Sequence, residues 1–284
     1  MRIGVALINL GKDRDRLAHM AQQFAQAGIA FERFEAVYGL AVPDSLRPWF
    51  FDLAGQPTPH LKPGEIGVYA SHLALHRQLL HRPEFDALVV FEDDCEIAPD
   101  FADVLKALAA SARNFDIVRL SNPTKAAYLD HGALVAGRHL VTYARVPNNM
   151  GCYLITRAGA LKTTASPSLR RYAIDEDFRR PWEIGIETLG VLPPPARANI
   201  FETSSIDAMG DRALGREGFM TKLKRRHRPG PVALMRQWRW QCARLGFGGY
   251  VRAILLSGLW SVAKRLSPRA AERVVSHFAM PGRP

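Results

Sequence analysis

Residues 87–101 read "ALVVFEDDCEIAPDF", an apolar run followed by acids and then by a helical pattern. The short apolar run ends in three adjacent acids, Glu92, Asp93 and Asp94, and the helical pattern that follows is "PDFADVLKALAASA". An apolar run of this length predicts a buried strand. In open α/β sheets, ligands bind outside the carboxyl ends of the strands, so the three acids predict a binding site at such an end.

Strand and helix patterns alternate on both sides of this stretch. Before it come a strand, "GVALINL" (4–10), and two helices, "DRDRLAHMAQQFAQAG" and "GEIGVYASHLALHRQLLH" (64–81); after it come "FDIVRLS" (115–121), "GCYLITRAGALKTTAS" and "AIDEDFRRPWEIGIETLGVLPPP". This alternation predicts an α/β fold, with a mixed, mostly parallel sheet and helices on both faces.

The charge of the chain is concentrated near its end. The 284 residues are 48% hydrophobic and carry a net charge of +11. Residues 1–211 hold 22 basic and 25 acidic residues, whereas residues 212–284 hold 16 basic and 2 acidic ones. We therefore expect a catalytic domain over 1–211 and a basic helical tail over 212–284. A neutral domain with a basic tail suggests an enzyme attached to something anionic.

The tail contains two stretches with apolar residues at helical spacing. They are Leu234, Trp238, Cys242 and Leu245, and then Val251, Leu255, Leu259 and Val262. Basic residues interleaved with Trp and Leu indicate a helix that lies on an anionic membrane surface. A solvated helical face is the plain alternative. Nucleic-acid binding is disfavoured, because no recognisable module is present and the charge does not extend into the main domain.

Cysteine usage and hydropathy indicate the compartment. Three widely spaced cysteines, Cys95, Cys152 and Cys242, form neither a disulfide framework nor a zinc pattern, which fits a reducing compartment. The opening residues indicate a strand and not a signal peptide. No run of about 18 uncharged apolar residues occurs, so we expect no spanning helix. The expected location is the cytoplasm, with the protein peripheral on the inner face of a membrane.

The acidic triplet itself suggests metal chemistry. Adjacent carboxylates repel one another and are stabilised by a cation. Mg²⁺ and Mn²⁺ prefer oxygen ligands and usually bind together with a phosphate. The triplet therefore predicts a metal-bridged diphosphate, and the alternative is a solvated acidic turn that caps the next helix.

Several segments occur in an order that resembles a known family. They are "INL", "FERFEAVYG", "LKPGEIGVYASHLALHRQLL", "ALVVFEDDCEI", "FDIVRLS", "GCYLITRAGAL" and "DEDFRRPWEIGIETLGVLPPP". Together they resemble glycosyltransferase family 25, the lipooligosaccharide galactosyltransferase group that includes collagen galactosyltransferases. The resemblance covers roughly residues 3–205. Its most specific parts are the stretch Gly64–His72 and the Glu-Asp-Asp that follows the strand.

The resemblance implies a GT-A-like fold, a nucleotide-sugar donor such as UDP-galactose, and Mn²⁺ or Mg²⁺ held by a DXD-like motif. Glu92 and Asp94 take the outer, metal-binding positions, and Asp93 is placed to hold the ribose or sugar of the donor. His72 belongs to the Ser-His signature and is expected in the donor site. The chain departs from the family at Tyr38, where members often have Asp.

A second acidic cluster, Asp175, Glu176 and Asp177, lies far from the first in sequence. Sugar transfer by direct displacement needs a carboxylate that accepts the proton of the acceptor hydroxyl. We expect Asp175 or Asp177 to be this base. The alternative is an acidic helix N-terminus that interacts favourably with the helix dipole.

Three more residues are candidates for the donor site. Asn9 ends the first strand, Arg16 could reach a phosphate or carboxylate, and Asn122 follows the strand "FDIVRLS". The alternatives are a turn for the asparagines and a surface ion pair for the arginine.

The combined expectation is a metal-dependent hexosyltransferase. It would move a hexose, galactose from UDP-galactose, onto a saccharide acceptor of a surface glycan such as lipooligosaccharide, and the resemblance implies inversion. Two rivals remain from other classes. One is a non-catalytic membrane or nucleic-acid adaptor with an inactive α/β domain, and the other is a metal-dependent nucleotide-sugar hydrolase.

Overall fold

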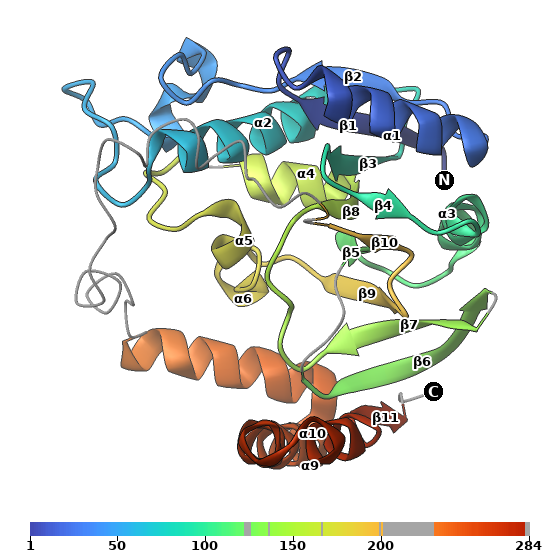
Figure 1. The fold of residues 1–284 in the computed structure, drawn as a ribbon. Helices are drawn as coiled ribbons and strands as arrows, with labels where there is room; N and C mark the ends of the chain where they lie inside the picture. Colours follow the sequence, from blue (N-terminus) through green and yellow to red (C-terminus); the bar gives the residue numbers. More distant parts are fainter. Residues whose placement is uncertain (122–125, 136, 166, 199, 201–229, 282–284) are drawn as a thin grey trace.

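A nine-stranded sheet forms the centre of the computed structural model, which describes residues 1–121, 126–135, 137–165, 167–198, 200 and 230–281 (Figure 1). The strands lie in the order β11 (Ala279–Pro281), β6 (Tyr128–Val135), β7 (Arg138–Tyr143), β9 (Thr188–Leu192), β5 (Ile117–Arg119), β8 (Cys152–Thr156), β3 (Ala87–Glu92), β1 (Ile3–Asn9) and β2 (Glu32–Glu35). The pairings give β7 and β8 one direction and the other strands the opposite one. The expected mixed, mostly parallel α/β sheet is confirmed.

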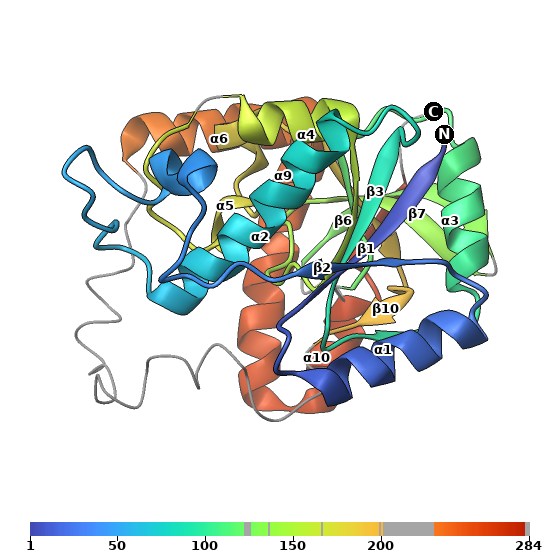
Figure 2. The ribbon, with the colours of Figure 1, turned by 90° about the horizontal axis from the view of Figure 1, so that it is seen from above.

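Helices cover both faces of the sheet, because successive side chains of a strand point to opposite faces. In β1, Val5 and Leu7 pack with helices α1 (Arg14–Gln26) and α3 (Phe101–Ala110), whereas Ala6 and Ile8 face α2 (Pro63–Leu80). The second face also carries the 3₁₀ helix η1 (Asp44–Trp49), α4 (Arg157–Thr164), α5 (Ile174–Asp177) and α6 (Pro181–Ile184), and Figure 2 shows α2 and α4 on the side away from α1 and α3. A short second sheet pairs β4 (Glu96–Ile97) with β10 (Ala196–Arg197).

Two glycines let the chain cross the N-terminal end of α2 at close range. A Cβ on Gly39 would lie 1.6 Å from the Pro63 carbonyl oxygen, and a Cβ on Gly67 would lie 2.6 Å from that of Val37. Ser71 fastens the crossing, since its hydroxyl accepts the Val37 N–H and donates to the Gly67 carbonyl, both at 2.8 Å. The stretch Gly64–His72 thus has a packing role besides any chemical one.

A third glycine, Gly159, stands inside α4. A Cβ there would lie 2.6 Å from the Asp116 carbonyl oxygen, so only glycine lets α4 approach the start of β5 this closely. Glycine inside a helix costs about 1 kcal/mol relative to alanine. The close packing of helix on strand explains its presence.

The C-terminal part is helical, as expected, and it returns to the sheet. Helix α9 (Pro231–Leu266) changes direction at Gly246, whose φ is 71°, and α10 (Pro268–Val275) follows (Figures 1 and 2). Strand β11 then pairs in parallel with β6, and Leu245, Leu256 and Phe278 pack in one apolar cluster with the β6 residues. The expected division between residues 211 and 212 lies outside the described residues and stays a prediction.

One helix in the described part of the chain, α9, is long and apolar enough to cross a membrane by length and composition. Only 17% of its most apolar window is buried in the protein. A single helix of this kind is weak evidence of a span, because core helices of soluble proteins meet the same criterion. The exposed large apolar side chains of α9 are Val232, Leu234, Met235, Trp238, Phe247, Val251, Ile254, Leu255, Leu259, Val262 and Leu266.

Candidate active site

The acidic triplet stands where the sequence predicted, at the carboxyl end of a central strand. Glu92 is the last residue of β3, and Asp93 and Asp94 form the turn after it. The three side chains are all partly buried, and they do not share one environment. Glu92 meets a histidine on α2, whereas Asp93 turns toward the end of β1.

Asp93 forms the centre of a polar cluster with two residues that the sequence singled out. Asn9 donates an amide N–H to Asp93 Oδ2 at 2.7 Å, and Arg16 Nη1 lies 3.1 Å from Asp93 Oδ1. Burial raises the pKa of Asp93, and the hydrogen bonds from Asn9 and Arg16 oppose that rise. The structure therefore brings Asn9, Arg16 and Asp93 together, and donor contact by these residues stays a prediction.

Sequence reasoning missed the fourth member of this cluster. Arg33 Nε donates to Asn9 Oδ1 at 3.0 Å from the neighbouring strand β2. Asn9 is almost fully buried, and its amide also donates to the Asp13 carbonyl at 3.0 Å. Because both ends of this amide are held by fixed partners, its orientation and that of Asp93 are set before any ligand arrives.

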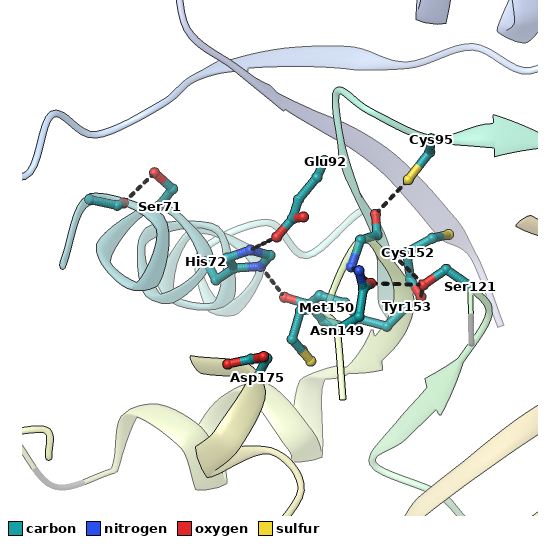
Figure 3. A network of polar contacts seen from close by, with 12 residues as sticks. Ser71, His72, Glu92, Cys95, Ser121, Asn149, Met150, Cys152, Tyr153 and Asp175 are labelled. Carbon is teal, nitrogen blue, oxygen red and sulfur yellow. Dashed lines mark hydrogen bonds and ion pairs between the residues drawn. The ribbon is translucent and has the colours of Figure 1, made fainter. Parts of the chain in front are cut away.

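Glu92 is the end point of a buried hydrogen-bonded chain. His72 Nε2 lies 3.3 Å from Glu92 Oε1, and His72 Nδ1 lies 2.8 Å from the Tyr153 hydroxyl (Figure 3). The same hydroxyl lies 2.8 Å from His76 Nε2, and His76 Nδ1 lies 3.0 Å from Thr163 Oγ1. His72 and His76 are both completely buried, so the two histidines are tied into one network.

One end of this chain has a fixed direction, because an ionised carboxylate only accepts hydrogen bonds and His72 Nε2 therefore donates to Glu92. At the other end, the Thr163 hydroxyl donates to the Ala160 carbonyl at 3.0 Å, so it accepts from His76 Nδ1. The Tyr153 hydroxyl lies between the two histidines. Burial lowers the pKa of His76 well below its usual range, which matches a neutral ring. His72 is completely buried, so it acts on the site through its contact with Glu92, and its expected contact with the donor stays a prediction. His76 is a core residue.

The second acidic cluster forms α5, and its two candidate bases point to different surroundings. Asn148 donates to Asp175 Oδ2 at 2.5 Å, whereas the Tyr69 hydroxyl donates to Asp177 Oδ2 at 2.8 Å. Burial raises the pKa of both carboxyls, that of Asp177 to about 6. The negative charge of Glu92 contributes to the rise at Asp175.

That electrostatic coupling places Asp175 beside the first cluster. Figure 3 draws Asp175 below the pair of His72 and Glu92, and residues of α2 and α5 share one apolar core on this face. No such coupling links Asp177 to Glu92. The structure therefore unites Asp175 with the acidic triplet, and it gives Asp177 a separate contact with α2.

A buried arginine lies beneath these acids, and sequence reasoning missed it. Arg119 ends β5, is completely buried, and donates to the Pro147 carbonyl at 3.3 Å and to Met150 Sδ. Burial lowers its pKa to about 10, which leaves the guanidinium charged at neutral pH, and the charges of Asp175 and Glu92 favour that form. The only sequence signal was a charge inside the apolar strand "FDIVRLS".

The carboxylates of the triplet fit a divalent cation that takes most of its ligands from substrate and water. Among the described residues, no three His, Cys, Asp or Glu side chains converge on one point. Glu92 and Asp94 offer carboxylate oxygens, and Mg²⁺ is commonly bound by one or two carboxylates together with substrate phosphates and water. The chemistry of these two carboxylates thus fits a metal that is shared with substrate phosphates. The remaining donor-site candidate, Asn122, lies outside the described residues.

Comparison with known proteins gives the family. A sequence model of glycosyltransferase family 25, described as LPS biosynthesis protein, matches residues 3–176, and the chain belongs to this family. A Haemophilus influenzae protein named "Putative glycosyltransferase" is 21% identical over 185 residues, which are 64% of this chain and 61% of that protein. The match therefore spans less than two thirds of that relative.

Among solved structures, this chain is similar to a mutant of beta-1,4-galactosyltransferase 7 from Drosophila, in complex with manganese, UDP-Gal and xylobiose. The likeness has a TM-score of 0.37 at 12% identity, over 81% of this chain and 82% of that one.

Proposed function

We propose that this member of glycosyltransferase family 25 transfers a hexose, galactose from UDP-galactose, onto a saccharide acceptor with inversion at the anomeric carbon. One observation carries the proposal. Asp175 and Glu92 come from segments far apart in sequence, yet Figure 3 draws Asp175 close to the pair of His72 and Glu92, and the charge of Glu92 adds to the rise that burial causes in the pKa of Asp175. A candidate base thus lies beside a candidate metal-binding carboxylate, which is the arrangement that single displacement needs.

In the proposed reaction the acceptor hydroxyl oxygen attacks the anomeric carbon of the donor. A new C–O glycosidic bond forms, the bond from that carbon to the diphosphate oxygen breaks, and the electron pair leaves with the nucleoside diphosphate. Asp175 takes the hydroxyl proton, and its hydrogen bond from Asn148 orients the carboxylate for this step. The raised pKa of Asp175 makes it a better proton acceptor than an exposed aspartate.

Glu92 and Asp94 would hold the divalent ion, and Asn9, Arg16 and Asp93 would meet the donor at the neighbouring strand end. A bound Mn²⁺ or Mg²⁺ would neutralise the negative charge that develops on the departing diphosphate. His72 would orient Glu92 through its Nε2–H, with Tyr153 fixing the ring behind it. Hydrogen bonds of this kind commonly orient the carboxylates that bind metals.

The acceptor in this proposal is a lipid-linked surface glycan such as lipooligosaccharide, assembled at the cytoplasmic face of a membrane. The family description as LPS biosynthesis protein supports it. The exposed face of α9, which includes Val251, Leu255 and Leu259, supports a peripheral membrane contact. Sedimentation with anionic vesicles tests the contact. Leu255→Glu with Leu259→Glu should abolish it, whereas Leu161→Glu, at an exposed leucine of α4, should not.

The donor and metal are tested by calorimetric titration of UDP and GDP, with and without Mn²⁺, into the wild type and an Asp94→Ala variant. We expect manganese-dependent binding of UDP, and loss of that binding in the variant. Absence of nucleotide binding to folded wild-type protein would contradict the proposal. The control is Asp103→Ala, which removes an exposed carboxylate from α3.

Two rival functions predict different results. A nucleotide-sugar hydrolase would release UDP from UDP-galactose at the same rate with and without a saccharide acceptor. A non-catalytic adaptor would keep its full cellular function in the Asp94→Ala variant. The transferase proposal expects UDP release that depends on an acceptor and is lost in that variant.

A further inference from the structure

A cleft of about 830 Å³ lies next to the candidate base. The segment from Arg171 to Glu183 forms one wall together with residues 144–146, and the inner side of α9 forms the other. Gln241 Nε2 donates to the Ala144 carbonyl at 2.8 Å, and Arg236 Nη1 lies 3.6 Å from Glu183 Oε2. These contacts hold the two walls together, so the cleft is a built feature of the fold.

Three arginines face this cleft, Arg145, Arg171 and Arg179, and none of them has a hydrogen-bond or ion-pair partner among the described residues. The charges of Glu176 and Asp175 act on Arg179 without a direct contact. The pKa of Arg179 is lowered, first by burial and then by repulsion from Arg145, so the two guanidinium groups are close to each other.

The carboxylates of the cleft are engaged elsewhere. Glu176 lies 3.6 Å from Arg180, Glu183 faces Arg236, and Asp177 accepts from Tyr69. None of these carboxylates forms an ion pair with the three arginines, although the charge of Glu176 acts on Arg179. An arginine presents a planar fork of N–H groups that matches the oxygens of a phosphate or carboxylate, so this wall is suited to an oxyanion.

Aromatic rings line the same cleft. Trp182 and Trp240 face each other from opposite walls, with ring centroids 5.9 Å apart, and Tyr172 and Tyr250 complete the set. Ligand pockets combine aromatic surface with a few convergent polar groups. Flat apolar rings beside unpaired cations therefore suit a ligand that has both a ring with apolar faces and a negative charge.

The cleft adjoins the reaction centre through two chain segments, because Glu176, the residue after Asp175, lines it. Arg145 lies in the wall, and Asn148, three residues later in the same segment, donates to Asp175. The charge of Asp175 also acts on Arg179. On its other side, α9 exposes apolar residues such as Val251 and Leu255. A saccharide in the cleft would thus lie between the candidate base and the helix proposed to contact the membrane.

We propose that this cleft is the acceptor site and that the acceptor saccharide carries an oxyanion, a phosphate or a carboxylate, held by Arg145 and Arg179. This inference rests on the proposed function, because it presumes transfer to an acceptor beside Asp175. The stacking surface for the sugar is the pair Trp182 and Trp240. The competing occupant of the arginines is the diphosphate of the donor.

The test measures sugar binding to the full chain by calorimetry. The probes are glucose 6-phosphate, glucuronic acid and neutral glucose, and the variants are Arg145→Gln, Arg179→Gln and their combination. We expect the wild type to bind at least one charged sugar about tenfold tighter than glucose, as a charge-assisted hydrogen bond contributes. The double variant should lose this preference, and Arg113→Gln, at an exposed arginine of another face, should keep it.

UDP binding with Mn²⁺ is measured on the same samples. This separates a failure of the acceptor-site inference from a failure of the proposed transferase function. Loss of charged-sugar preference with unchanged UDP binding supports the inference, and a preference for only one charged sugar identifies the anion. Equal affinity for glucose and both charged sugars in the wild type overturns it, as does a parallel loss of UDP affinity. If the wild type binds no nucleotide, the proposed function fails, while the sugar titrations still decide whether the cleft selects anionic sugars. Arg145→Gln alone, at an exposed side chain, serves if the double variant does not fold.

Discussion

The two acidic clusters of this chain have similar composition and opposite surroundings. Glu92–Asp94 ends a buried strand, and its first two carboxylates diverge, one to His72 and the other to Asn9 and Arg16. Asp175–Asp177 forms a short helix, where residues two apart point in different directions. Asp175 therefore faces Asn148 and the first cluster, while Asp177 faces Tyr69. Adjacent acidic residues can therefore have different surroundings, because the backbone conformation directs each side chain to a different place.

The largest expected effect separates the two carboxylates of the second cluster. Asp175→Asn should lower kcat by about 10²–10⁴-fold, the range typical of a lost general base. UDP binding should be unchanged, because Asp175 is not proposed to hold the donor. Asp177→Asn should lower kcat far less. The measurement is UDP release with an acceptor, and an equal loss in both variants would remove the distinction between them.

The pKa of about 6 at Asp177 gives the next effect. The folded state binds more protons than the unfolded state between pH about 4 and 6, so this residue makes stability fall as pH rises through that window. A rise of about two units corresponds to roughly 3 kcal/mol. Asp177→Asn should remove this fall, as measured by urea unfolding across pH 3.5–7.

The control for that experiment is Asp86, whose contribution to stability changes with pH in the opposite direction. Hydrogen bonds from Arg2 lower the pKa of Asp86, so Asp86 contributes stability that is present above its unfolded pKa and is lost as pH falls. Relative to the wild type, Asp86→Asn should lose stability only as pH rises toward about 4, so its unfolding is also measured below pH 3.5, whereas Asp177→Asn should gain stability between pH about 4 and 6. The same trend in both variants would contradict the assignment.

A smaller effect is expected in the first cluster at Asn9. Asn9→Ala leaves the buried Asp93 with one donor fewer and Arg33 without its acceptor. An unsatisfied buried polar group costs about 1–3 kcal/mol. Urea unfolding should show this loss, and Asn114→Ala, at an exposed position, should show almost none.

The smallest expected effect concerns the chain behind Glu92. Tyr153→Phe removes the hydroxyl that joins His72 to His76. We expect the variant to need about tenfold more Mn²⁺ for half-maximal UDP binding, as is typical when a residue that orients a metal ligand is lost. Tyr143→Phe is the matched control. Tyr143 is equally buried, and its hydroxyl has no hydrogen-bond partner among the described residues. Equal effects in the two variants would mean that the chain does not orient Glu92.

Much of the fold followed from local patterns in the sequence. The apolar runs predicted β1, β3, β5 and β8, and helical spacing predicted α1 and α2, because the side-chain periods of strands and helices are local properties. The return of the C-terminal segment to the sheet as β11 was not predicted. Three residues carry too little apolar pattern to indicate a strand, and β11 is held by its pairing with β6.

The sequence was enough to name the chemical groups of the site and to place Asn9 and the acidic triplet at the ends of strands. That these two strands are parallel neighbours is seen only in the structure. Only the tertiary structure decided which carboxylate meets which partner. Tyr153 and Arg119 join the site across strand pairs, and Asp175 joins it through the packing of α5 on α2. Such contacts depend on the pairing of distant segments, which no local pattern in the sequence encodes.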